Sequence, residues 1–86
     1  MKHARDSALD LLETLLSQIR TQEGLKERKR GVFYRGSAAF LHFHEDPAGL
    51  FADVRLAADW ERTPVNTAAE RRRLVAKIKA VLRQAR

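Results

Sequence analysis

Residues 40–54 read FLHFHEDPAGLFADV and predict two antiparallel strands joined by a tight turn. Aromatic and aliphatic residues, which favour strands, make up most of the sequence on each side of residues 46–49. The Asp-Pro-Ala-Gly of that segment is typical of a four-residue turn, because proline presets the second backbone position and glycine tolerates the last. A turn of this length places His42 directly opposite Asp53 on the returning strand.

A second hairpin precedes the first in the chain. Residues 31–35 and 38–44 are rich in strand-forming side chains, and the Gly-Ser at 36–37 suits a two-residue turn with glycine first. Such a turn pairs Phe33 with Phe40. Because side chains alternate along a strand, the two registers together place a continuous apolar set on one sheet face, the expected core face. That face holds Val32, Tyr34, Ala39, Leu41, Phe43, Leu50, Ala52, Val54 and Leu56.

The opposite sheet face combines aromatic with ionisable side chains. Three phenylalanines are more than a solvated sheet face usually displays. The sequence therefore leaves three alternatives for this face, which are cover by the chain's own elements, cover by a second subunit, or a ligand pocket. The residues expected on it are Phe33, Phe40, His42, His44, Phe51, Asp53 and Arg55.

A helix is expected on each side of the strands. Residues 7–23 carry leucine and isoleucine at helical spacing, and Ser7 is the expected cap. Thr67 and Glu70 have the spacing of a capping box, which begins a helix running to about residue 85. Between the hairpins and this helix, residues 50–57 supply the third strand, and residues 58–66 form a short fourth strand or an irregular connection.

The predicted order is therefore helix, three or four antiparallel strands, helix. Helices at both ends of the chain, packed on one antiparallel sheet, make an α+β two-layer sandwich. A chain of 86 residues is enough for one domain, and we take residues 1–86 as a single unit. A domain this small gains from burying more surface, so a homodimer is one of the expected states.

Composition excludes several classes of protein. There is no cysteine, so disulfide scaffolds, thiolate zinc sites and cysteine nucleophiles are ruled out. No apolar run approaches the roughly 18 residues of a membrane span, and the first residues lack the apolar stretch of a signal peptide. The expectation is a cytoplasmic protein with no membrane partner.

The net charge of +6 belongs to the last helix. Residues 67–86 contain seven basic residues and one acidic residue, whereas residues 1–66 are balanced. Such a helix could contact nucleic-acid phosphates, with the sheet phenylalanines stacking on bases. Charges beside an apolar helical stripe are, however, normally only solvated, so nucleic acid is the less favoured partner. The candidate phosphate contacts are Arg72, Arg73, Lys77, Lys79 and Arg83.

Metal binding is a further alternative. His42 and His44 point to the same face of one strand, and Asp53 lies opposite His42. Two imidazoles and a carboxylate are the ligand set of a facial triad. The competing interpretation is a hydrogen-bonded pair of His42 with Asp53 across the strands, and on that interpretation no cofactor is expected. Catalysis is disfavoured because no serine is placed beside the histidines as a nucleophile.

The segment from Gly31 to Val54 resembles the luciferase-family domain, in which an H-x-H-x-D-like turn precedes a strand that bears an aspartate. The order of elements is similar to that of proteins of the YjbR/MmcQ type. Both are small bacterial α+β proteins of unknown function. The resemblance implies an α+β fold and no established activity, with His42, His44 and Asp53 as the polar residues of the motif.

The sequence thus favours a non-catalytic module that binds a protein or a small ligand on its mixed sheet face. Electrostatic nucleic-acid binding through the last helix and divalent-metal binding at the histidines are the two alternatives.

Overall fold

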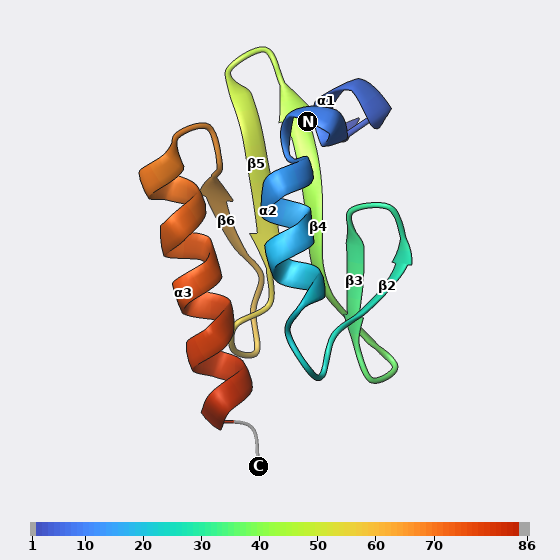
Figure 1. Cartoon of the computed structure of the whole chain (residues 1–86), viewed down its shortest axis with the longest axis vertical. Coiled ribbons are helices and arrows are strands. Elements are labelled where there is room, and N and C mark those ends of the chain that lie inside the picture. The colour runs from blue at the N-terminus through green and yellow to red at the C-terminus, as the bar shows by residue number, and fades with distance from the viewer. Residues whose placement is uncertain (1, 85–86) are drawn as a thin grey trace.

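A computed structural model describes residues 2–84 of the chain. The two-residue strand β1 comes first, helices α1 and α2 and then a meander of strands follow, and the long helix α3 ends the described chain (Figure 1). In chain order the elements are β1 (Lys2–His3), α1 (Asp6–Leu11), α2 (Glu13–Arg20), β2 (Lys26–Lys29), β3 (Val32–Arg35), β4 (Ala38–Asp46), β5 (Gly49–Val54), β6 (Glu61–Pro64) and α3 (Ala68–Gln84).

All strands form one antiparallel sheet in the order β2-β3-β4-β5-β6, and β1 pairs with β4 beyond the end of β3. Helices α2 and α3 lie side by side over one face of this sheet (Figure 1). The prediction of an α+β fold with an antiparallel sheet is confirmed. The predicted three to four strands are too few, because the sheet has six.

The two strands that the sequence pattern missed lack a strand-like composition. β2 reads Lys-Glu-Arg-Lys, whose charged residues disfavour a strand but protect an exposed sheet edge from pairing with other chains. β1 has only two residues, too few for any periodicity. At the other edge β6 realises the short fourth strand, and its Pro64 is tolerated there because no strand follows β6 in the sheet.

The register between β4 and β5 is confirmed. His42 pairs with Asp53, and Glu45 with Leu50. The turn is tighter than predicted, since Asp46 also pairs with Gly49 and only two residues remain in the loop.

The predicted pairing of Phe33 with Phe40 is wrong. Tyr34 pairs with Ala39 as expected, but Phe33 pairs with Leu41, so β4 contains one extra residue at this point. This bulge carries Phe33 and Phe40 to the core, where they are 1% and 2% exposed. Tyr34 follows Phe33 in the strand and consequently belongs to the other face, not to the core face.

The first predicted helix is divided into two. The break falls at Leu12, whose N–H donates to the Leu9 carbonyl in a tightened turn. Ser7 does not cap the first segment, because the helix starts one residue earlier and its N-cap is Arg5. The Glu45 carboxylate accepts the Arg5 N–H at 2.6 Å and so ties this helix end to β4.

Helix α3 begins as the sequence predicts. The Glu70 N–H donates to the Thr67 hydroxyl at 3.1 Å, and the Thr67 N–H donates to the Glu70 carboxylate at 3.1 Å. The predicted end of this helix, at about residue 85, lies outside the described residues.

One hydrophobic core lies between the helices and the sheet. Its most deeply buried members come from α2, α3 and the central strands, together with Leu12 between the first two helices and Val65 after β6. No helix among residues 2–84 is long and apolar enough to cross a membrane. The core contains Leu9, Leu12, Leu15, Leu16, Ile19, Phe33, Phe40, Leu41, Phe43, Ala52, Val54, Val65, Leu74 and Ile78.

Candidate functional site

The sheet face that points away from the core carries the candidate site, and we call it the open face. Strand alternation places the core residues Leu41 and Phe43 on one face of β4, and therefore His42 and His44 on the other. Asp53 of β5 joins them because it pairs with His42.

Three imidazoles meet on this face. His3 of β1 lies directly opposite His44 in the sheet. The ring centroids of His44 are 4.8 Å from those of both His3 and His42, and His3 and His42 are 5.4 Å apart. One ligating nitrogen from each ring lies within 4.8 Å of the others. The chain contains three histidines, so all of them belong to this cluster.

His44 is the buried centre of the cluster, with 8% of its surface exposed. Its Nε2 lies 2.9 Å from Nδ1 of His42 and 3.2 Å from Oδ2 of Asp53. Its Nδ1 is buried and forms no hydrogen bond within the described residues.

Asp53 is anchored by an arginine from the next strand. Arg62 of β6 pairs with it across the sheet and donates to both carboxylate oxygens, at 2.8 and 2.9 Å. Arg62 lowers the pKa of the Asp53 carboxyl below its usual range, so the group is ionised at neutral pH. The predicted hydrogen bond between Asp53 and His42 is not formed, although their register is right, because the carboxylate contacts Arg62 and His44.

The two strand histidines are held in their neutral form. Burial lowers the pKa of His42, and repulsion from His44 lowers it further. Burial also lowers the pKa of His44, while Asp53 opposes the shift. A neutral imidazole has a free lone pair and is the form that binds metal ions.

Aromatic and cationic side chains border the cluster. The ring of Trp60, from the loop before β6, lies 4.9 Å from the ring of His42. The guanidinium of Arg55 lies 5.1 Å from the centre of the Trp60 ring, a cation–π arrangement. Phe51 is half-buried and pairs with His44. Of the predicted face, Phe33 and Phe40 are absent, because the bulge carries them to the core.

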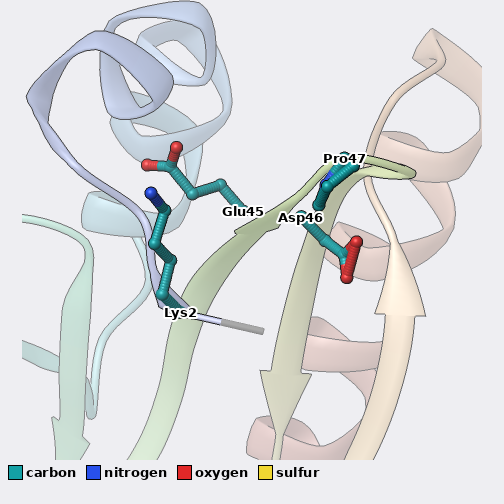
Figure 2. Close-up of a pocket in the computed structure, with 4 residues that line it drawn as sticks. All are labelled: Lys2, Glu45, Asp46 and Pro47. Atoms are coloured by element: carbon teal, nitrogen blue, oxygen red, sulfur yellow. The ribbon is translucent and has the colours of Figure 1, made fainter.

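A hollow near the β4–β5 turn is lined by Lys2, Glu45, Asp46 and Pro47. The Lys2 amine and the Glu45 carboxylate lie on one side of the sheet, whereas the Asp46 carboxylate points the other way (Figure 2). The two acidic groups therefore do not converge on one point, and we do not regard this hollow as a cation site.

The candidate phosphate contacts of α3 do not form one patch. Arg72 and Lys79 line a groove between α2 and α3. Lys77 is on the other side of the helix, where it pairs with Glu61 of β6. These cations therefore lie on two sides of α3.

Comparison with protein-family models, with curated proteins and with solved structures finds no match for this chain.

Sequence reasoning found His42, His44 and Asp53 but missed His3 and Arg62. No local pattern connects His3 to the central hairpin, since only the pairing of β1 with β4 brings it there. Arg62 had a detectable signal, because extending the β5 register into a fourth strand would have placed a basic residue opposite Asp53.

Proposed function

We propose that this protein is a binding module whose open face binds one divalent transition-metal ion through His3, His42 and His44. The observation that carries the proposal is the convergence of all three histidines of the chain on one sheet face. Nitrogen donors suit zinc, copper, nickel and cobalt better than magnesium or calcium. The ligand set differs from the set expected from the sequence, because His3 takes the place of Asp53.

The distances between the histidine nitrogens are close to those of a zinc site, and a small movement of the side chains would complete it. Zinc–nitrogen bonds of about 2.0–2.1 Å at the tetrahedral angle separate two nitrogens by roughly 3.3 Å. Nε2 of His44 and Nδ1 of His42 are 2.9 Å apart, so this pair has to open only slightly. The third ring, His3, is exposed and lies at the end of a short strand, and its rotation would bring its nitrogen within range.

Asp53 would supply charge beside the ion. Its Oδ2 is 3.2 Å from the ligating nitrogen of His44, and both of its oxygens accept from Arg62. An ionised carboxylate at this distance offsets part of the charge of a dication. Asp53 is thus a source of negative charge beside the ion in this proposal and not one of its ligands.

The test is a titration of untagged protein with zinc or cobalt(II), followed by calorimetry and by the imidazole signals in NMR spectra. We expect one ion per chain and shifts of all three histidine rings. Replacing His44 with alanine should abolish binding, since it removes the central ligand. Asp46→Asn is the matched control, because it removes an acidic group of the same strand outside the cluster.

Histidine signals that stay in place at a two-fold excess of zinc and of cobalt would overturn the proposal. So would binding that His44→Ala leaves intact or that Asp46→Asn removes, because the ion would then sit on acidic surface groups.

A further inference from the structure

We propose that the groove between α2 and α3 binds an acidic helix of a partner protein. This groove is on the helix side of the sheet, opposite the histidines, so the proposal is independent of metal binding. Helices α2 and α3 run side by side there (Figure 1). The cavity between them has a volume of about 610 Å³ and is lined by Thr14, Ser17, Gln18, Thr21, Gln22, Arg72, Val75, Ala76 and Lys79.

The groove continues toward the C-terminal end of α3. A second hollow shares Thr21, Gln22 and Lys79 with the first, and adds Glu23, Leu82 and Arg83. Together the two hollows extend along α3 from Arg72 to Arg83, a distance of about 16 Å at 1.5 Å per residue. That length accommodates about three turns of a bound helix.

Charge is distributed unequally between the two walls. The α2 wall presents only hydroxyl and amide groups at the first hollow, and Glu23, just after α2, adds one carboxylate at the second. The α3 wall presents Arg72, Lys79 and Arg83, which form no ion pair within residues 2–84. By contrast, Arg20, Arg30 and Arg62 are each paired with a carboxylate of the chain itself. The groove thus carries an excess of cations, with three basic side chains and the one carboxylate of Glu23, which pairs with none of them in the described chain.

The spacing of these cations matches a helix. Arg72 and Lys79 are about 10.5 Å apart along the axis, and Lys79 and Arg83 about 6 Å. Acidic residues at positions i, i+4 and i+11 of a second, antiparallel helix have the same spacing, since both helices rise equally per residue. Exposed Ala76 lies between the cations and lets a helix approach to the usual 8–10 Å between axes. Half-buried Val75 and Leu82 offer apolar contacts at the base of the groove.

A nucleic acid fits the groove less well. Single strands are usually bound by aromatic side chains that stack on the bases, and no aromatic residue lines either hollow. The cations occupy one wall only. This matches an acidic amphipathic helix, which needs cationic contacts on one side and neutral contacts on the other.

The probe is a synthetic peptide of about 18 residues, long enough to form a helix, with glutamates at the matching positions and leucines on the adjacent stripe. We expect it to shift the backbone NMR signals of Ser17, Gln18 and Ala76, and to bind more weakly as salt is raised. Lys79→Glu should weaken binding at least ten-fold, because it places a like charge opposite the glutamates.

Arg73→Glu is the matched control. It makes the same charge change at another exposed position of α3, but Arg73 does not line the groove. A peptide of the same composition with its glutamates spread around the helix is the second control and should bind weakly. Circular dichroism of both variants checks that they fold.

Equal losses in Lys79→Glu and Arg73→Glu would overturn the proposal, because binding would then depend only on net charge. Peptide-induced shifts confined to the open face would do the same. A single-stranded oligonucleotide that shifts the groove signals while the acidic peptide does not would replace the proposal with nucleic-acid binding.

Discussion

His3 and His44 lie directly opposite each other in the pairing of β1 with β4, and their ring centroids are 4.8 Å apart. The shortest strand of the sheet therefore contributes one of the three imidazoles. Strand β1 therefore extends the sheet along the free edge of β4 and, through His3, also completes the histidine cluster.

His3→Ala separates metal affinity from stability. His3 is exposed, so its loss should change the free energy of unfolding by no more than about 0.5 kcal/mol. It should nevertheless weaken zinc binding at least ten-fold, because one of three ligands is lost. Urea unfolding and zinc titration measure the two effects. Unchanged zinc affinity in this variant would show that His3 is not a ligand.

Asp53→Asn should weaken metal binding about ten-fold, because it removes the negative charge that offsets part of the charge of the ion. The side chain keeps its size but loses the charge that faces His44 and Arg62. Competition with a chelator measures the change. If Asp53→Asn binds zinc as tightly as the unmodified protein, the charge of the carboxylate contributes nothing to binding.

Stability should fall as the medium is acidified below about pH 6.5, the ordinary pKa of a histidine. Burial lowers the pKa values of His42 and His44 in the folded protein, so the unfolded chain binds more protons in the range below 6.5. The stability that comes from keeping these two histidines neutral is fully present above about pH 6.5. It is lost as the pH falls toward the lowered pKa values. The charged groups facing the two rings are Asp53, Arg62 and His3.

Urea midpoints at pH 7.5 and 5.5 measure this effect. The difference between them should shrink in a variant with asparagine at positions 42 and 44. Asp53 does not interfere, because its own pKa is lowered and it titrates in a more acidic range. Equal pH dependence in the variant and the unmodified protein would contradict the prediction.

Phe33→Ala should lower the free energy of unfolding by about 3–5 kcal/mol, because the ring is 1% exposed and the change leaves a cavity. Tyr34→Ala should cost clearly less, since Tyr34 is half-buried on the open face, where Arg28 lies 4.5 Å above its ring. Urea unfolding of the pair distinguishes the two faces. The reverse order would mean that β3 and β4 pair without the bulge.

Gly31→Ala should be more destabilising than Gly36→Ala. Both glycines have a positive φ, of 79° and 63°, so alanine costs about 1–2 kcal/mol of backbone strain at either position. At Gly36 the added Cβ would meet nothing within 4 Å, whereas at Gly31 it would lie 2.8 Å from Cδ2 of buried Leu9. Comparison of the two melting temperatures tests this, and equal losses would show that Leu9 moves aside freely.

The sequence predicted the centre of the fold because its signals there are local. Turn chemistry between Asp46 and Gly49 sets the β4–β5 register, and the Thr67–Glu70 box sets the start of α3. The bulge beside Phe33 was not predictable in the same way, because a two-residue turn permits a regular ladder and only core packing selects the extra residue.

The sequence predicted only part of the candidate site. Alternation along one strand brings His42 and His44 together, and it needs no knowledge of the rest of the chain. The position of His3 depends on which edge of β4 remains free after β3 ends, which is a property of the assembled sheet. Arg62 likewise becomes a partner of Asp53 only once β6 is recognised as a strand.

Strand β4 alternates between the core, with Leu41 and Phe43, and the imidazole cluster, with His42 and His44. Insertion or deletion of a single residue between Leu41 and His44 would move the residues on one side of the change to the opposite face, burying histidines or exposing apolar side chains. Evolution can therefore alter the cluster by point substitution, but it cannot shift the cluster along the strand without unfolding the domain. Length variation among related chains should accordingly be confined to the loops, with the interval from Leu41 to His44 kept constant.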